Sequence, residues 1–443
     1  MLSCWRTARL APAALALVLA SPGAVRAAGS DLDARIDQEA QRVAPQIVEL
    51  RHKIHQNPEL SNRESQTAAL VAEYLRSLGL TPQTGIAKTG VVALLKGGRP
   101  GPLIAVRADM DALPVTEQTD LPFKSTKRDT YLGQEVGVAH ACGHDIHTSS
   151  LLGVASVLTA VQKDLPGSVL FIFQPAEEGA PPGEKGGASL MLEEGLFRQA
   201  RPAAIFALHS FPELEVGQIG FNAGPTMAAV DQFRIKIKGK QAHGAYPHLS
   251  VDPIVIGSEA VLALQTIRSR NLSPLEPSVI TVGIFRGGER FNIIPGEVAL
   301  EGTVRTYNDE VRNEIERRMR EILDGITKAN GATFEMDYQR NAPATVNDPA
   351  LTQNVRPLLE RTLGAGNVKI VEPTMGAEDF AYFAKEVPGF YYRLGVLKPG
   401  TTSGGLHTPT FRGDDSAVPV GIRVMSRLLV DYLLSSSGSK SSR

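Results

Sequence analysis

The sequence predicts an α/β fold: a mostly parallel sheet with helices on both faces, interrupted by an inserted ferredoxin-like α+β unit. First, short and nearly unbroken apolar segments alternate with helical segments on both sides of residues 223–341, which is typical of parallel strands buried on both faces. Second, residues 223–341 change to a period-two alternation of apolar and polar residues, as in strands with one face in solvent. Third, the length of 443 residues is enough for two or three domains with a buried core.

Residues 31–222 form the first part of the predicted α/β domain. The elements expected there are helices at 31–56, 64–78, near 148–161 and near 188–194, and strands at 90–95, 103–108, 168–173 and 203–208. In such sheets a ligand binds beyond the carboxyl ends of the strands. The polar motifs that contain Asp109, Glu177 and His209 begin where predicted strands end, so we expect a site at that edge of the sheet.

Residues 223–341 predict the inserted unit in full. Residues 233–238 (FRIKIK) alternate with period two, and the elements after them complete a β-α-β-β-α-β order, the ferredoxin-like arrangement. These elements are a helix at 253–268, strands at 278–285 and 297–306, a helix at 309–329 and a strand at 333–338. The α/β domain resumes over residues 342–434, with elements at 350–362, 368–371, 377–387, 390–394 and 418–434. The Ser-rich tail, residues 435–443, is expected to be disordered.

Charge and the N-terminal segment bound the class of protein and its location. With 46 basic and 47 acidic side chains, the chain lacks the basic surface of a nucleic-acid-binding protein. Two arginines precede an apolar run at residues 10–20, and small residues lead to a cleavage point after Ala27 or Ala28. This pattern predicts a signal peptide over residues 1–27, and hence export to a periplasm or out of the cell; the alternative is a buried N-terminal helix. No later segment has the roughly 18 apolar residues of a membrane helix.

Histidines gather around one of the two cysteines. The chain has only two cysteines, Cys4 and Cys142, which excludes a disulfide framework. Cleavage after Ala27 would leave Cys142 as the single thiol. Cys142 and His144 flank Gly143, whose backbone freedom lets a thiolate and an imidazole converge on a metal ion. The alternative is a histidine-rich turn that caps the following helix.

Two adjacent carboxylates and two separate histidines complete the candidate chemistry. Glu177 and Glu178 follow a predicted strand, and adjacent side chains point in different directions, so one can bind a metal while the other serves as general base. A solvated acidic loop is the alternative. His209 ends an apolar strand and His407 lies in a Gly-rich loop. Each alone is more typical of a structural histidine than of a metal ligand.

Six motifs together resemble one known family. They are RADMDALP at 107–114, HACGHD at 140–145, PAEEG at 175–179, LH at 208–209, GAEDF at 376–380 and GGLHTPTF at 404–411. In this order they resemble the co-catalytic metallopeptidase and amidohydrolase family of aminoacylase, carboxypeptidase G and acetylornithine deacetylase. Within it they resemble the hippurate hydrolase and indoleacetyl-amino-acid hydrolase branch. The resemblance spans residues 31–434, and it implies that the inserted unit is a lid and dimerisation domain.

The resemblance implies a centre for two divalent metal ions. Its ligands would be Cys142, His144, Glu178, His209 and His407. Glu177 matches the general base that activates a water between the two ions. The ions would be zinc, manganese, cobalt or nickel, because a site with sulfur, nitrogen and oxygen donors accepts each of them.

The resemblance also implies roles around the metal ions. Asp111 matches a residue that orients a ligand histidine. Asp109 stands where the wider family has a histidine ligand, so we expect the RADMD motif to support the ligands rather than to bind metal. His243 resembles a lid histidine that reaches the partner subunit's site and stabilises an oxyanion. Asn292 and Arg305 match positions that hold the substrate's carboxylate, although Arg305 is equally compatible with a charge at a strand edge.

The expected activity is hydrolysis of the amide bond of N-acyl or N-aroyl amino acids by a homodimer. The alternative is a metallo-exopeptidase, a carboxypeptidase or dipeptidase, that acts on short peptides with the same chemistry. A more distant alternative is an exported binding protein without catalysis. The expected partners are a small-molecule substrate and a second copy of the chain, with no nucleic acid and no membrane span.

Overall fold

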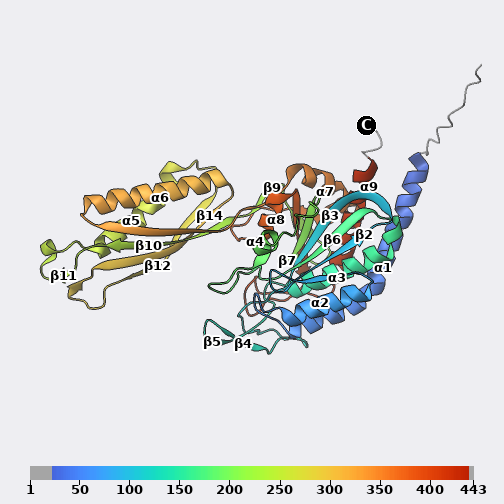
Figure 1. Cartoon of the computed structure of the whole chain (residues 1–443), viewed down its shortest axis with the longest axis horizontal. Coiled ribbons are helices and arrows are strands. Elements are labelled where there is room, and N and C mark those ends of the chain that lie inside the picture. The colour runs from blue at the N-terminus through green and yellow to red at the C-terminus, as the bar shows by residue number, and fades with distance from the viewer. Residues whose placement is uncertain (1–21, 439–443) are drawn as a thin grey trace, which may run out of the picture.

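The computed structural model describes residues 22–438, whose two largest sheets are of different kinds (Figure 1). The larger sheet has eight strands in the order β1-β2-β6-β3-β7-β18-β8-β17. Their bounds are β1 Gln83–Ile86, β2 Gly90–Lys96, β6 Pro166–Gln174, β3 Arg99–Asp109, β7 Ile205–Glu215, β18 Gly389–Leu397, β8 Ile219–Phe221 and β17 Val368–Ile370. The central neighbours β6, β3, β7 and β18 are parallel, whereas β1, β2 and the β18–β8 pair are antiparallel.

Helices cover both faces of this sheet, as the apolar strands predict. One face packs against α1 Pro22–Gln56, α2 Ser65–Ser77, α3 His144–Ala160, α7 Pro349–Leu363 and α9 Ala417–Gly438. The other packs against α4 Gly187–Glu193 and α8 Phe380–Glu386. Every residue from His144 to Leu158 is buried, because α3 lies between the sheet, α1 and α9. The prediction of a mostly parallel sheet with helices on both faces is confirmed.

The second sheet belongs to the inserted unit. Its elements are β10 Ala229–Lys238, α5 Pro253–Thr266, β12 Ser278–Gly287, β14 Glu297–Thr306, α6 Asp309–Ala329 and β15 Thr333–Ala342. The strands pair antiparallel in the order β12-β14-β10-β15, and both helices pack on one face through an apolar core. Asp252 and Asn308 cap the two helices with side-chain hydrogen bonds, which explains where each helix begins.

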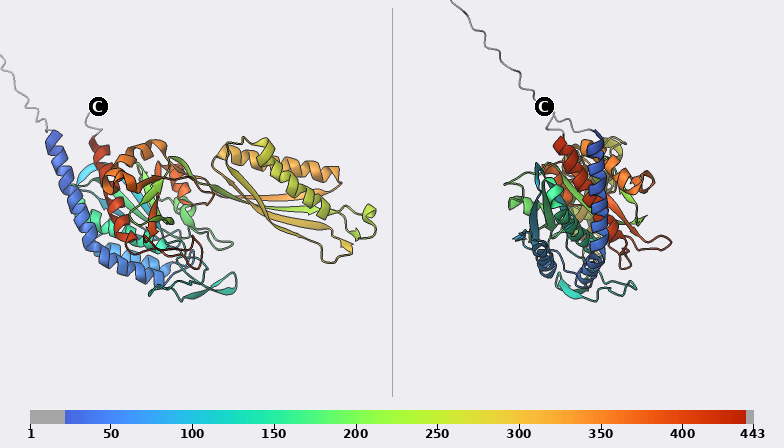
Figure 2. Two further views of the ribbon diagram at one scale, coloured as in Figure 1. Left: turned by 180° about the vertical axis from the view of Figure 1, so that it is seen from behind. Right: turned by 90° about the vertical axis from the view of Figure 1, so that its right-hand side faces the viewer.

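The inserted unit extends away from the larger part of the molecule (Figures 1 and 2). The chain enters it after β9 Gly224–Met227 and leaves it before β16 Thr345–Asn347, and these two strands pair antiparallel. At its far end lie the short strands β11 Ala242–His243 and β13 Ile293–Ile294 (Figure 1). A hairpin of β4 Arg128–Tyr131 and β5 Gln134–Gly137 projects from the larger part.

The structure changes one expectation at the C-terminus. Helix α9 continues through Gly438, so residues 435–438 are helical rather than disordered. The physical reason is that α9 stays packed on the core as far as Leu433, and the hydroxyls of Ser435 and Ser437 find acceptors in its preceding turn, the carbonyls of Tyr432 and Leu433. The rest of that tail, and residues 1–21 of the predicted signal peptide, lie outside the described residues. Within residues 22–438 no helix has the length and apolar character needed to cross a membrane.

Candidate metal centre

The candidate site lies at the carboxyl edge of the central parallel strands. Strand β3 ends at Asp109 and β6 ends at Gln174, directly before the segment with the paired glutamates, while β7 carries His209. Helix α3 begins at His144 against the same edge. Segments that are far apart in the chain therefore deliver their polar side chains to one place, as the topology of parallel strands requires.

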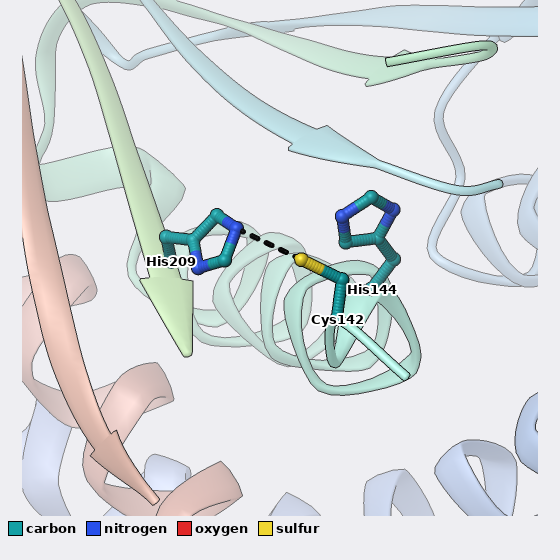
Figure 3. A group of neighbouring side chains, drawn as sticks. All are labelled: Cys142, His144 and His209. Atoms are coloured by element: carbon teal, nitrogen blue, oxygen red, sulfur yellow. Dashed lines mark hydrogen bonds between the residues drawn. The ribbon is translucent and has the colours of Figure 1, made fainter. Parts of the chain in front are cut away.

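Cys142, His144 and His209 converge in the buried part of the site (Figure 3). One potential ligand atom from each lies within 4.8 Å of the others. The Cys142 Sγ atom is 3.4 Å from Nε2 of His209. Between Cys142 and His144, Gly143 has a φ of 84°, a left-handed conformation that glycine adopts without strain. This turn directs the thiol and the imidazole toward the same point.

Backbone carbonyls orient the two buried imidazoles. Nδ1 of His144 donates to the carbonyl of Asp111 at 2.8 Å, and Nδ1 of His209 donates to the carbonyl of Ser210 at 2.8 Å. Because a carbonyl can only accept, Nδ1 carries a proton in both rings. Nε2 is then the nitrogen that each ring presents to the cluster. Metal-binding histidines are commonly oriented in this way.

Glu178 and His407 extend the cluster toward solvent. Oε1 of Glu178 lies 3.2 Å from Nε2 of His407, and both residues have ligand atoms close to Cys142. Glu178 also has an oxygen close to Nε2 of His144, at 3.8 Å. The structure thus brings all five predicted ligands into one continuous group, with half-exposed His407 at its mouth.

The donors in this group fit a pair of transition-metal ions. Nε2 of His144 is buried and has no hydrogen-bond partner, and Oε1 of Glu178 contacts the imidazole of His407. Sulfur, imidazole nitrogen and carboxylate oxygen are the donors that zinc and its neighbours bind in proteins. Within residues 22–438 the unpaired Nε2 of His144, beside the thiol and the carboxylate, points to a cation as its partner.

The electrostatics of the group also favour a cation. Burial raises the pKa of the Cys142 thiol well above its ordinary value, and the carboxylates of Glu178 and Glu177 raise it further. Burial alone would lower the pKa of His144, but the carboxylates of Asp109 and Asp111 outweigh it and raise that pKa to about 10. A bound metal ion reverses both effects, because it replaces the protons as the positive charge of the site.

Glu177 is a buried carboxylate among other carboxylates. Burial, followed by the charges of Glu378 and Glu178, raises its pKa well above the ordinary value. One of its oxygens accepts a hydrogen bond from the backbone N–H of Asp379 at 3.4 Å. A carboxylate in such surroundings has a strong affinity for a proton, which suits a general base.

Two further carboxylates hold the turn that carries the paired glutamates. Asp111 accepts hydrogen bonds from the backbone N–H groups of Glu177 and Glu178 at 3.1 and 3.0 Å. Glu64 accepts from the N–H of Ala176 at 2.8 Å, and Ala176 has a left-handed φ of 52°. Glu64 was not among the predicted site residues, because only the fold places the start of α2 beside this turn.

Asp109 is held behind the ligands by two cationic or donor groups. It pairs with Arg107 Nη1 at 2.7 Å and with His147 Nδ1 at 2.6 Å. Arg107 in turn pairs with Glu378 at 2.8 Å and with Asp379 at 3.0 Å. The RADMD and GAEDF motifs contain these residues, but the sequence did not reveal that Arg107 joins the two motifs.

The three predicted residues of the inserted unit lie away from this cluster. His243 is exposed on β11 and pairs in register with Ile293, and the carbonyl of neighbouring Asn292 accepts a hydrogen bond from Gly244. Both therefore lie at the far end of the unit (Figure 1). Arg305 lies near its other end, in β14 opposite Val230. The structure does not bring any of the three to the five ligand residues of the same chain.

Comparisons with known proteins match nearly the whole chain. A family model described as Peptidase family M20/M25/M40 matches residues 105–431. N-acetyl-L-cysteine deacetylase of Bacillus subtilis is 38% identical over 377 residues, 84% of this chain and 85% of the relative. Thermostable carboxypeptidase 2 of Saccharolobus solfataricus is 36% identical over 406 residues, 91% of this chain and 99% of the relative. The crystal structure of a dinuclear metal-binding peptidase of the M20 family from Bacillus subtilis matches with a TM-score of 0.76 at 34% identity, covering 89% of this chain and 99% of that chain.

Proposed function

We propose that this chain, which belongs to Peptidase family M20/M25/M40, cleaves the amide bond of N-acyl or N-aroyl amino acids. Members of this family are metal-dependent hydrolases, and so is this chain. The observation that carries this proposal is the buried Glu177 carboxylate beside a group of five ligand residues. The similarity to an N-acetyl-L-cysteine deacetylase supports this substrate class. The similarity to a carboxypeptidase favours the second candidate, cleavage of short peptides from their carboxyl end.

The five ligand residues would hold two divalent metal ions. These residues are Cys142, His144, Glu178, His209 and His407. When bound, such ions supply Lewis acidity and lower the pKa of water. We propose zinc, manganese, cobalt or nickel, because the thiol and the imidazoles exclude a centre of the purely oxygen-ligated kind.

Glu177 would move the protons of the reaction. Its carboxylate takes a proton from the attacking water and then delivers it to the leaving amine nitrogen. The Asp379 N–H and the Asp111 carboxylate position this residue from both sides, through its side chain and its backbone N–H. This arrangement keeps the carboxylate aimed at the centre while the proton is transferred.

The inserted unit would act as a lid in a homodimer. His243 lies at the far end of the unit, beyond the reach of its own chain's cluster in this arrangement (Figure 1). The unit also exposes large apolar side chains, namely Tyr246, Leu249, Val255, Leu262, Leu275, Phe285, Phe291 and Ile293. A symmetric second copy would cover such a surface, and it would bring His243 of one chain to the other chain's site.

We propose that the enzyme is exported to a periplasm or out of the cell. The support is the basic, apolar and small-residue order of residues 1–27. N-terminal sequencing of the protein recovered from the secreted or periplasmic fraction tests it, and a mature chain beginning at Ala28 or Gly29 is the expected result.

A substrate panel tests the reaction. The purified protein is stripped with a chelator, reloaded separately with zinc, manganese, cobalt or nickel, and assayed on benzoylglycine, N-acetyl amino acids and dipeptides. We expect chelation to abolish turnover, metal to restore it, and acyl amino acids to be preferred. Preference for dipeptides would instead establish the exopeptidase, and binding without turnover would establish a non-catalytic protein.

Glu177→Gln tests the role of the general base. The variant keeps the shape of the side chain but cannot accept the proton, so we expect kcat to fall by about 10²- to 10⁴-fold with unchanged metal content. Glu193→Gln, the same change at an exposed position, is the control and should retain full activity. Near-normal turnover of the Glu177 variant would remove this residue from the role.

A further inference from the structure

Arg393 differs from the other buried arginines of the chain. Arg51, Arg107 and Arg312 are each at most 5% exposed, and each pairs with at least one carboxylate. Arg393 is also only 5% exposed, but among the described residues its side chain has no hydrogen bond and no ion pair. Its guanidinium carbon instead lies 4.5 Å from the centre of the Phe211 ring. A buried charge without a counter-ion is strongly unfavourable, so this guanidinium calls for an anionic partner.

The unpaired atoms of Arg393 form one edge of its guanidinium. They are Nε and Nη2, both buried and both without a partner. In Arg312 the same two nitrogens hold the carboxylate of Asp231, and in Arg427 they hold that of Asp37. This edge therefore has the geometry for two parallel hydrogen bonds to a carboxylate.

Arg393 lies next to the candidate metal centre. On the parallel strands β18 and β7 it is the register partner of His209, so the two side chains project from the same face of the sheet. The rings of His209 and Phe211 are 6.4 Å apart, and the guanidinium lies over the second of these rings. Its position is thus at the carboxyl edge of the sheet, where a substrate of this site must bind.

Glu213 is a carboxylate near Arg393 that forms no ion pair with it. Glu213, farther along β7, is exposed and raises the pKa of Arg393 through space, whereas burial lowers that pKa. Burial raises the pKa of Tyr307, and Arg393 lies close enough to oppose this rise. Tyr307 follows the last residue of β14. The guanidinium therefore lies near both the metal centre and the base of the inserted unit.

We infer that Arg393 binds a carboxylate of the substrate, which makes this residue part of a carboxylate subsite beside His209. This inference rests on the proposed function, in which every acyl amino acid carries an α-carboxylate. Glutamate or aspartate derivatives carry a second carboxylate on the side chain. The same guanidinium edge suits either group, and the experiment distinguishes them.

Matched acid and amide substrates test the subsite. Arg393→Met and Arg393→Lys are compared with the wild-type enzyme on benzoylglycine against benzoylglycinamide, with benzoate measured, and on N-acetylglutamate against N-acetylglutamine, with acetate measured. Arg76→Met, at an exposed position of α2, is the control. Calorimetry of benzoylglycine and N-acetylglutamate binding to the metal-free proteins gives a readout that does not depend on turnover.

The expected result is a loss confined to the acids. Hydrogen bonds to charged groups predict a fall of about 10- to 100-fold in kcat/KM or binding for Arg393→Met, with less than about 3-fold for the matched amides and a partial recovery in Arg393→Lys. A loss on benzoylglycine identifies the α-carboxylate as the bound group. A loss on N-acetylglutamate relative to N-acetylglutamine, with benzoylglycine unchanged, identifies the side-chain carboxylate.

Two outcomes overturn the subsite. The first is an equal change for acid and amide, or no change for either. The second is a Glu213→Gln variant that loses as much activity as Arg393→Met does, on the acid and the amide substrates equally. In that case Arg393 and Glu213 would stabilise each other in the fold, and Arg393 would not bind substrate. If the wild-type enzyme cleaves none of these compounds, the proposed function fails, and the calorimetric comparison still decides the role of Arg393.

Discussion

The buried histidine His55 links helix α1 to the start of α3, where the predicted ligand His144 lies. Its Nδ1 lies 2.9 Å from Asp145 and its Nε2 3.1 Å from Glu117. Asp145 follows the predicted ligand His144 and also pairs with Arg51 at 2.9 Å. Burial alone would lower the pKa of His55, but the charge of Asp145 and the hydrogen bonds outweigh it and raise this pKa to about 9.

His55 therefore predicts a pH-dependent part of the stability. Its folded-state pKa of about 9 lies above the unfolded value of about 6.5, so its contribution is complete below pH 6.5 and is lost as the pH rises through 9. The shift corresponds to roughly 3 kcal/mol. We expect the difference in unfolding free energy between wild type and His55→Gln, measured with urea in chelator, to shrink by this order between pH 6 and pH 9.5.

The control for this experiment is His248→Gln, at an exposed position of the inserted unit. It should change the free energy of unfolding by no more than about 0.5 kcal/mol at either pH. A wild-type minus His55→Gln difference that stays constant across the range would show that the imidazole is neutral in the folded protein.

At the scale of elements, the start of α3 is fitted tightly against β7. Gly143, at a φ of 84°, separates two of the predicted ligands. A Cβ atom added to it would lie 2.1 Å from the Ser210 hydroxyl oxygen and 3.3 Å from the Phe411 ring. That hydroxyl donates to the carbonyl of Cys142 at 2.7 Å. The same contact therefore sets both the helix position and the thiol position.

Gly143→Ala should weaken metal binding as well as stability. The left-handed backbone alone costs about 1–2 kcal/mol for alanine, and the clash with Ser210 adds about 1–3 kcal/mol. The control is Gly183→Ala, where φ is 80° and the added Cβ meets nothing within 4 Å, so only the backbone cost remains. Urea unfolding and the metal content per chain measure both effects.

If Gly143→Ala and Gly183→Ala lose the same stability and bind the same amount of metal, the contact with Ser210 does not position the ligands. The geometry of Figure 3 would then tolerate a shift of α3 along β7.

For the whole molecule, the separation between the two parts is the main feature. The inserted unit is joined to the larger part at the paired strands β9 and β16, and His243 lies at its far end (Figures 1 and 2). A residue at that distance can reach a metal centre only through a large closure of the unit or by acting on a second chain. The proposed dimer makes the second route available.

Mixed dimers distinguish the two routes. We expect His243→Ala and Glu177→Gln to be inactive separately, and an equal mixture to recover about a quarter of the wild-type activity, because half of randomly formed dimers are mixed and each has one intact site. A mixture of Glu177→Gln with His144→Ala, in which no site is intact, is the control. Verified mixed dimers without recovered activity would mean that His243 acts within its own chain or has no part in the reaction.

Much of the fold was predictable because it depends on local patterns. The period-two alternation of residues 233–238 lies within β10, and the apolar stripe of residues 309–329 coincides with α6. The pairs β4–β5 and β9–β16 were not predicted. Their strands have three or four residues each, which is too short for a periodic signal. The helical residues 435–438 were not predicted, because serine has a low helix propensity and its composition does not show that α9 extends into this segment.

The sequence by itself determined the fold class, the order of the elements and the kinds of side chain at the ends of the strands, since these depend on the spacing of neighbouring residues. It also placed Cys142, His144, Glu178, His209 and His407 in motifs, and their roles as ligands stay predictions. Only the tertiary structure decided which atoms meet. Asp111, in the loop just after β3, holds the turn of Glu177, and Arg107 pairs with Glu378, 271 positions along the chain. The tertiary structure also places no carboxylate of the described residues within ion-pair distance of Arg393. Charge pairing between distant segments depends on their packing and not on local sequence.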